Sequence, residues 1–343
     1  MGIDSKFDFA IKISAMNDFV KPDKALLLNA ERFNPDCAES SWTLPGDWYY
    51  RSEIYARECE RIFSRHWIYL GHESDITSTP KTEIVNGRHF EILRGLDGRP
   101  RATNTDNQNP ALLEVMAGFV FINLDINATA LSEQIGGFVD DIKDCCPRVE
   151  DLIPVKRIER EIQANWKTVI DNNHECYHCA LNHKSLMKLV DYENEADWKD
   201  DGITFSHRVK RKNLENPAYA LKPGEIRQDS LFGYVWPNLI PLWFPGTPSA
   251  VMFQVIPTGP ESCIARHDFY FLRQQLSRQE KDFIDYIDQV LVPEDLGLCE
   301  SVQKGLHSMG YHQGKFVVDY RHPEFSEHHV HFFQQMLFKS LTE

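Results

Sequence analysis

The chain has 343 residues, of which 42% are hydrophobic and 12% aromatic, enough for a sizeable core in one large domain or two smaller ones. Its formal net charge of −14 argues against nucleic acid or an anionic membrane as the main partner. No run of eighteen apolar residues is present, and eight cysteines in a long chain without a secretory signal favour reduced thiols and a cytoplasmic protein.

Residues 1–150 are expected to form a small region with one helix and several short strands. Apolar periodicity predicts the helix at residues 52–67. Alternating residues predict strands at 68–70, 89–93 and 119–124. The last two of these strands are separated by residues 95–109, a turn-rich and polar stretch. We place a domain boundary near residue 150.

Residues 151–343 are expected to combine an antiparallel sheet with helices. Segments that carry β-branched and aromatic residues between turn signals predict strands at 154–162, 202–210, 233–236, 251–256 and 263–272. Apolar periodicity predicts helices at 279–291 and 295–308, and the segment 322–335, rich in histidine and phenylalanine, is expected to be helical as well.

The segment from Asp171 to His183, DNNHECYHCALNH, contains three histidines and two carboxylates within thirteen residues. We expect it to lie on a helix after the strand at 154–162. Histidines clustered on a helix can also be core or capping residues. Because imidazole nitrogens and carboxylate oxygens are common ligands of transition metals, their density here indicates a metal site.

One interpretation of this segment uses His174 and His178, which fit the pattern H-E-x-x-H. On a helix these two imidazoles share a face and can bind one zinc ion, with Glu175 as general base. The pattern is short, and the glycine and histidine that metzincins carry downstream are absent, since positions 181 and 184 are Leu181 and Lys184.

A second interpretation uses His178 and His183 with a distant carboxylate, as in the 2-His-1-carboxylate sites of non-haem Fe(II) oxygenases. A spacing of five residues places two side chains about 140° apart on a regular helix, so the helix must end, kink or bulge near Asn182. The best candidate for the carboxylate is Asp295, at a helix start after a proline, with Glu300 in reserve.

Two further groups carry possible metal or redox chemistry. Cys176 and Cys179 form a C-x-x-C pair, which would suit a redox pair or half of a zinc site, but no second such pair accompanies it. The late histidines are expected at the surface or in packing: His322, His328, His329 and His331.

Residues 165–183 contain three motifs in succession: Asn-Trp-Lys, an acidic-Asn pair, and Glu-Cys-Tyr-His-Cys-x-x-x-His. This order of motifs resembles the iron segment of Rieske-type oxygenase large subunits. The resemblance is strongest to the branch that acts on quaternary amines, the choline, glycine betaine and carnitine monooxygenases. Further stretches resemble the same family in the same order: 48–76, 118–125, 236–238 and 293–306.

The resemblance implies roles for individual residues. His178 and His183 match the iron-binding histidines, Asp295 matches the ligand carboxylate, and one Fe(II) per chain is expected. Glu175 matches the acidic residue that links an iron histidine to the Rieske cluster of the neighbouring subunit. The implied fold class is α+β, with an antiparallel sheet wrapped around a long helix, of the helix-grip or START-like type, in a catalytic domain at residues 151–343.

The chain departs from the family pattern in its first half. A Rieske [2Fe–2S] centre needs two cysteines and two histidines, which the family places between the strands expected at 89–93 and 119–124. From Glu60 to Lys143 the chain has no cysteine, and its only histidines there are His66, His72 and His89. We therefore expect no [2Fe–2S] cluster and a reduced, β-rich remnant of a Rieske domain at residues 1–150.

The function implied by the resemblance is that of an Fe(II)-dependent oxygenase that uses O2 on a small organic substrate without its own cluster. Electrons would come from the substrate, from an external small reductant, or from a Rieske-bearing paralogue in a mixed trimer, since the family commonly forms trimers. Two alternatives remain open: a non-catalytic subunit of such an oxygenase, and a zinc hydrolase built on H-E-x-x-H.

The quaternary-amine branch also suggests that ring faces hold a cationic substrate. Five aromatic residues on or beside the expected strands could supply them: Tyr234, Trp236, Trp243, Phe244 and Phe253. The alternative is that these rings belong to the core, and an apolar substrate would fit them equally well.

Overall fold

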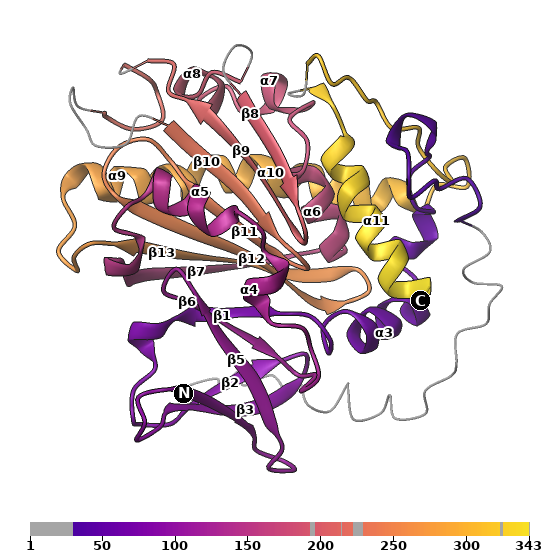
Figure 1. The fold of residues 1–343 in the computed structure, drawn as a ribbon. Coiled ribbons are helices and arrows are strands. Elements are labelled where there is room, and N and C mark those ends of the chain that lie inside the picture. The colour runs from indigo at the N-terminus through magenta and orange to yellow at the C-terminus, as the bar shows by residue number, and fades with distance from the viewer. Residues whose placement is uncertain (1–29, 193–195, 214, 222–228, 323–324, 343) are drawn as a thin grey trace, which may run out of the picture.

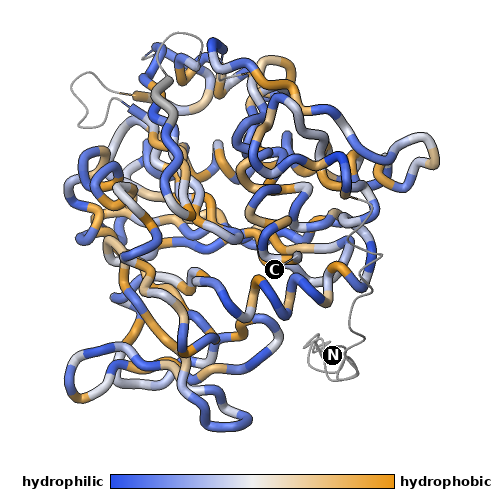
Figure 2. The backbone as a smooth tube through the Cα atoms, turned by 45° about the vertical axis from the view of Figure 1, so that its right-hand side comes forward, coloured by the Kyte–Doolittle hydropathy of each residue, from blue (hydrophilic) through white to orange (hydrophobic). Residues whose placement is uncertain are grey.

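Two antiparallel sheets form the centre of the protein, as seen in a computed structural model that describes residues 30–342 except 193–195, 214, 222–228 and 323–324 (Figure 1). The α+β fold class with antiparallel sheets is thereby confirmed. Hydrophobic and hydrophilic residues alternate over short distances along most of the described chain (Figure 2), as expected when each element turns one face inward.

The first sheet has six strands in the order β1-β6-β5-β4-β3-β2, and every neighbouring pair is antiparallel. Its strands are β1 (Ile68–His72), β2 (Lys81–Val85), β3 (Arg88–Arg94), β4 (Pro100–Asn104), β5 (Pro110–Met116) and β6 (Phe119–Asn123). The three strands predicted in this region are confirmed, and β2, β4 and β5 are additional. The stretch predicted to be a turn-rich linker therefore contains a strand, β4, between two turns.

The second sheet has seven antiparallel strands in the order β7-β13-β12-β11-β10-β9-β8. Its strands are β7 (Ile153–Ile162), β8 (Ala196–Asp201), β9 (Thr204–Lys210), β10 (Asp229–Val235), β11 (Leu239–Trp243), β12 (Ser249–Gly259) and β13 (Ser262–Phe271). All five strands predicted in this half are confirmed, although the predicted bounds differ by up to about four residues.

Helices cover the second sheet and one end of the first. In Figure 1, α5 lies over β9 and β10 on the near side, while α9 and α10 pass behind the strands, and α11 lies beside α6. The α-helices are α3 (Ser52–Arg61), α4 (Leu131–Gln134), α5 (Phe138–Cys145), α6 (Trp166–Asn173), α7 (Cys179–Asn182), α8 (Leu186–Leu189), α9 (Arg278–Tyr286), α10 (Val292–Leu306) and α11 (His328–Thr342). A π-helical turn, Ile287–Leu291, joins α9 to α10, and short 3-10 turns occur at Ala38–Ser40, Gly46–Tyr49, Glu73–Asp75 and Val149–Asp151.

The two sheets pack against each other through a shared hydrophobic core, in which residues of β1 and β6 contact residues of β10–β13. A polar group at this contact fixes their relative position. The hydroxyl of Tyr69 donates to Asp268 Oδ2 at 2.9 Å, and Arg157 donates to both oxygens of the same carboxylate at 2.5 and 2.7 Å. A bidentate pair of this kind adds geometric specificity to the apolar contact.

The motif Asn165-Trp166-Lys167 anchors α6, the helix that leads into the metal segment. The side chain of Asn165 caps the helix by accepting from the backbone N–H of Lys167 at 2.9 Å. Trp166 donates its Nε1–H to Glu58 of α3 at 2.8 Å, and Lys167 forms a fully buried ion pair with the same carboxylate. These contacts fix the start of α6 against α3, and therefore the position at which α6 ends.

Among the described residues, no helix combines the length and the apolar character that crossing a bilayer requires.

Acidification is expected to destabilise the fold, because several histidines are held in apolar surroundings. Burial lowers the pKa of His66 and His267 to about 4 and that of His207 to about 3. Since these folded values lie below the unfolded value of about 6.5, the stability that they provide is present above about pH 6.5 and is lost as the pH falls toward about 4. The urea concentration at the midpoint of unfolding should therefore decrease as the pH is lowered from about 7 to about 4.5. A midpoint that stays constant over this range would contradict this expectation.

Candidate metal centre

The metal segment consists of two short helical pieces separated by a non-helical turn. Helix α6 ends at Asn173, the chain leaves helical geometry at His174, and α7 begins only after His178. The break predicted near Asn182 is present, because α7 ends there and His183 follows it. The single helix that we expected is wrong. The H-E-x-x-H interpretation needs that continuous helix, so the local geometry does not support a zinc hydrolase site.

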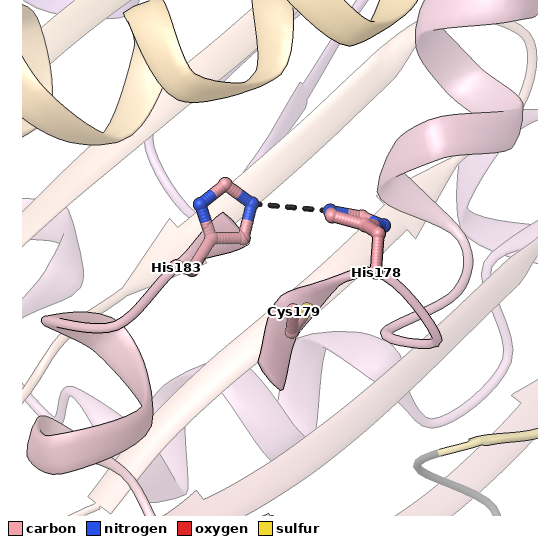
Figure 3. A group of neighbouring side chains, drawn as sticks. All are labelled: His178, Cys179 and His183. Atoms are coloured by element: carbon pink, nitrogen blue, oxygen red, sulfur yellow. Dashed lines mark hydrogen bonds between the residues drawn. The ribbon is translucent and has the colours of Figure 1, made fainter. Parts of the chain in front are cut away.

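Three ligand atoms from two distant parts of the chain meet in a small triangle. His178 Nε2 lies 3.1 Å from His183 Nε2, and the two nitrogen atoms point toward each other (Figure 3). Asp295 Oδ1 lies 2.9 Å from His183 Nε2 and 3.4 Å from His178 Nε2. The structure therefore brings together the three residues that the sequence selected as metal ligands.

The size of this triangle matches the coordination of a small divalent ion. Such an ion holds nitrogen and oxygen ligands at about 2.1 Å, so two ligands at right angles lie about 3 Å apart. Three mutually adjacent ligands occupy one face of an octahedron and leave the opposite face open for other molecules. The donor set and its spacing thus fit a mononuclear 2-His-1-carboxylate site.

Asp295 lies in the first turn of α10, directly after an irregularity in the helix. The π-helical turn Ile287–Leu291 runs directly into α10, whose first turn contains Pro293, Glu294 and Asp295. The helix is continuous here, so Pro293, which has no backbone N–H to donate, coincides with the π-helical irregularity and not with a free helix end. Glu300, the reserve candidate, lies away from the triangle and accepts a hydrogen bond from the backbone N–H of Gln163 at 3.2 Å.

A second layer of carboxylates orients both imidazoles. Glu175 Oε1 lies 2.6 Å from His178 Nδ1, and Glu294 Oε2 lies 2.9 Å from His183 Nδ1. When Nδ1 carries the proton and donates it to a carboxylate, Nε2 keeps the lone pair that a metal requires. Asn172 donates to Asp295 Oδ1 at 2.9 Å and so fixes the third donor. Sequence reasoning selected Glu175 but missed Glu294 and Asn172.

The charges of the metal-free site are tightly coupled. Burial alone would raise the pKa of Asp295, but hydrogen bonds from His178 and His183 outweigh burial and lower it to about 2. Burial alone would lower the pKa of His178, but hydrogen bonds to Asp295 and Glu175 outweigh it and raise the value to about 9. The pKa of His183 is raised for the same reason, chiefly through Asp295. Protons therefore occupy the site when no metal does.

Metal affinity is expected to increase with pH, because a metal ion must displace these protons. The folded pKa of His178 lies above its unfolded value, so the stability that its protonation provides is complete below about pH 6.5 and is lost as the pH rises through about 9. Anaerobic Fe(II) titrations should show tighter binding at each step from about pH 6 to about pH 9. An affinity that does not change with pH would exclude this proton competition.

Cys176 and Cys179 are joined by a disulfide, so the expectation of reduced thiols is wrong for this pair. A ligand atom of Cys179 lies within 4.8 Å of ligand atoms of His178 and His183 (Figure 3). The thiolate is the form of cysteine that binds metals, and a disulfide sulfur is not a thiolate. The carboxylate of Asp295 can therefore serve as a third donor, whereas the disulfide sulfur of Cys179 is not a thiolate ligand.

A cavity of about 80 Å³ adjoins the metal triangle. Besides His178, His183 and Asp295, the described residues around it include four aromatic side chains and two further imidazoles: Tyr192, Phe205, Phe232, Phe244, His174 and His207. The structure does not gather the five predicted aromatic residues around this cavity. Of these five, Phe244 lines it, Tyr234 packs on His174, and Trp236, Trp243 and Phe253 pack elsewhere in the interior.

The chain is similar to known proteins in sequence and in fold. The profile of the family described as "Ring hydroxylating alpha subunit (catalytic domain)" matches residues 149–343. The carnitine monooxygenase oxygenase subunit of Acinetobacter baumannii is 28% identical over 358 positions, which cover 89% of this chain and 95% of that protein. The chloroplastic choline monooxygenase of Amaranthus tricolor is 23% identical, with 86% of this chain and 77% of that protein covered.

Among solved structures, the quaternary ammonium Rieske monooxygenase CntA is similar with a TM-score of 0.80 and 26% identity, covering 90% of this chain and 96% of that chain. Naphthalene 1,2-dioxygenase from Rhodococcus sp. has a TM-score of 0.73 at 16% identity, covering 93% of this chain and 98% of that chain. The second likeness concerns the fold alone.

Proposed function

The chain belongs to the ring-hydroxylating alpha subunit family, and on that premise we propose that it is an Fe(II)-dependent oxygenase acting on a small organic substrate. It is an oxidoreductase, like its monooxygenase relatives. The observation that carries the proposal is the triangle of His178 Nε2, His183 Nε2 and Asp295 Oδ1, with separations of 2.9 to 3.4 Å. One Fe(II) per chain would be held by these three atoms.

The residues of this chain prepare the site for that ion. Glu175 and Glu294 hold the Nδ1 protons of the two histidines, which keeps each Nε2 directed at the same point. Asn172 holds Asp295 in place. Apolar and aromatic side chains of the cavity limit the access of water: Leu186, Phe232, Leu242, Phe244 and Leu291. When bound, Fe(II) supplies the reaction with O2, and the surrounding residues orient the substrate.

The chain is proposed to work without its own [2Fe–2S] cluster. It has no cysteine between Glu60 and Lys143, and such a cluster requires two. The alignment with the Acinetobacter baumannii relative spans 358 positions, more than the 343 residues of this chain, so that relative contains residues without a counterpart here. Electrons then come from the substrate, from an external reductant, or from another subunit.

A second candidate function is that of a subunit in a mixed assembly, in which a Rieske-bearing paralogue supplies the electrons or the present chain is not catalytic. Glu175 favours this candidate, because its carboxylate contacts His178 while it also lines a separate cavity on the α10–α11 side of the site. Inter-subunit electron transfer is named for the structurally similar quaternary ammonium Rieske monooxygenase. The corresponding assemblies are a homotrimer or a mixed trimer.

The two candidates differ in what the purified chain does alone. The Fe(II)-loaded protein should consume O2 in the presence of ascorbate and a quaternary amine if it is an independent oxygenase. Uptake that appears only after a reduced Rieske-bearing paralogue is added would favour the mixed assembly. Uptake under neither condition, at full iron occupancy, would favour the non-catalytic subunit.

The division of the chain into domains is also a proposal that follows from the family membership. We assign residues 1–150 to a truncated Rieske-like region and residues 151–343 to the catalytic domain, with α6 as the helix around which the second sheet wraps in helix-grip fashion. This assignment is supported by the packing of α6 on β12 and by the limits of the family match. A cytoplasmic location is proposed with it.

A further inference from the structure

The disulfide between Cys176 and Cys179 encloses one of the metal ligands. The two cysteines lie three positions apart, and His178 lies between them in the short ring that the bond closes. Both cysteines also line the cavity that adjoins the metal triangle. A change in the state of this bond therefore acts directly on the segment that carries His178.

The disulfide lies just beneath the surface of the protein. Cys176 and Cys179 are 7% and 4% exposed, whereas Tyr177 and Leu181 on the same segment are 59% and 83% exposed. The helix that begins at Cys179, α7, has only four residues. Because short surface segments open locally at low cost in free energy, a small dithiol can reach this bond without unfolding the protein.

The sulfur of Cys179 lies close to both imidazoles of the metal triangle. It is within 4.8 Å of a ring nitrogen of His178 and of His183 (Figure 3). Bonds of about 2.3 Å to sulfur and about 2.0 Å to nitrogen place these atoms about 3.5 Å apart in a tetrahedral zinc site. A shift of roughly 1 Å thus brings the sulfur into range, and rotation of a released cysteine side chain about its Cα–Cβ bond can supply it. No other cysteine among the described residues belongs to such a group.

We propose that this disulfide is a redox switch of the metal centre, because its reduction releases the Cys179 sulfur to bind the metal beside His178 and His183. The proposal rests on the proposed function, since it assumes that the same histidines hold Fe(II) in the oxidised form. In that form the sulfur is bonded to Cys176 and is not a thiolate. Three protein ligands then leave positions open for O2 and substrate.

The switch requires a dithiol in one direction and hydrogen peroxide in the other. A thiolate of the dithiol attacks the disulfide, and a second exchange releases the reagent as a cyclic disulfide, after two electrons and two protons have passed to the cysteines. When the sulfur of Cys179 binds a metal ion, its proton is released to solvent. In the reverse direction, one H2O2 takes two electrons and two protons from the pair, which forms the disulfide and two water molecules.

Reduction is expected to change the metal preference of the site. A thiolate is a soft ligand that favours Zn(II), and four protein ligands match the closed tetrahedral sites of structural zinc. The four are His178, His183, Asp295 and Cys179. The reduced chain should bind Zn(II) more than about tenfold tighter than the oxidised chain, because even second-layer changes alter metal affinity by about 10- to 100-fold.

Cobalt(II) reports the sulfur ligand directly, because a thiolate bound to Co(II) gives an intense near-ultraviolet charge-transfer band that imidazole and carboxylate ligands do not give. The full chain, loaded anaerobically with Co(II), should lack the band while oxidised. It should gain the band after treatment with dithiothreitol and removal of the reagent. Two matched variants both abolish the disulfide. Cys176→Ser leaves Cys179 free and should show the band without reduction, whereas Cys179→Ser should show it in neither state.

Three outcomes overturn the proposal: no band in the reduced parent, a band that persists in Cys179→Ser, or equal Zn(II) affinity of the oxidised and reduced parent. Circular dichroism of both variants shows whether they are folded, and the reduced parent tests the same point without a substitution. The iron content of the oxidised parent after Fe(II) loading is a separate readout. Normal iron without the cobalt band rejects the switch alone, whereas missing iron counts against the proposed function.

Discussion

Replacement of Asp295 by alanine is expected to weaken Fe(II) binding by more than about 100-fold, because the change removes one of three ligands while second-layer changes alone typically cost 10- to 100-fold. Asp295 Oδ1 is the atom that closes the triangle with the two imidazoles, at 2.9 and 3.4 Å. Its loss also leaves the Nε2 atoms of His178 and His183 without their common partner. An anaerobic titration of the apo protein with Fe(II) measures the change.

Glu300→Ala is the matched control, because this carboxylate lies on the same helix and accepts only from a backbone N–H in the described contacts. It should leave iron affinity within about twofold of the parent. Both variants are to be compared by circular dichroism, so that a loss of folding is not taken for a loss of ligand. Normal affinity in Asp295→Ala would remove this residue from the site.

Lys167→Met is expected to destabilise the fold by about 3–5 kcal/mol, because it leaves the buried carboxylate of Glu58 without its cation. Both side chains of this pair are fully buried, and Glu58 also accepts from Trp166 at 2.8 Å. Burial raises the pKa of Glu58 and lowers that of Lys167, so each charge depends on the other. Urea unfolding of the metal-free protein measures the loss.

The double variant Glu58→Gln/Lys167→Met is the control. It removes both charges, while the amide oxygen still accepts from Trp166, so most of the loss should be recovered. A double variant that is as unstable as Lys167→Met would show that the charge itself is not the cause. Because this pair fixes the start of α6, the single variant should also lower iron occupancy, and the double variant should restore it.

The grouping of His178, His183 and Asp295 could be predicted from the sequence, because clustered histidines are rare and the resemblance to a family pointed to the distant carboxylate. Two histidines five residues apart demanded a helix break, and the break is present between α7 and His183. Asp295 stood out through its position just after Pro293. The π-helical turn that precedes it was not predicted.

The surroundings of the ligands could not be predicted in the same way. Glu294 meets His183 across 111 positions of sequence, and only the folded chain brings them together. Alternation along a strand predicts two faces but not which face adjoins a cavity. The sequence therefore favoured Trp243 and Phe253 as substrate-binding residues, whereas the structure shows that Phe205 and Phe232 line the cavity. The strands β2 and β4 were missed because their sequences, KTEIV and PRATN, carry little apolar pattern.

The most direct test of the proposed metal centre is the iron content after anaerobic Fe(II) loading of the parent, His183→Ala and His174→Ala. We expect about one iron per chain in the parent and in His174→Ala, little or none in His183→Ala, and no acid-labile sulfide in any sample. Iron that survives in His183→Ala but is lost in His174→Ala would contradict the assignment of the metal centre.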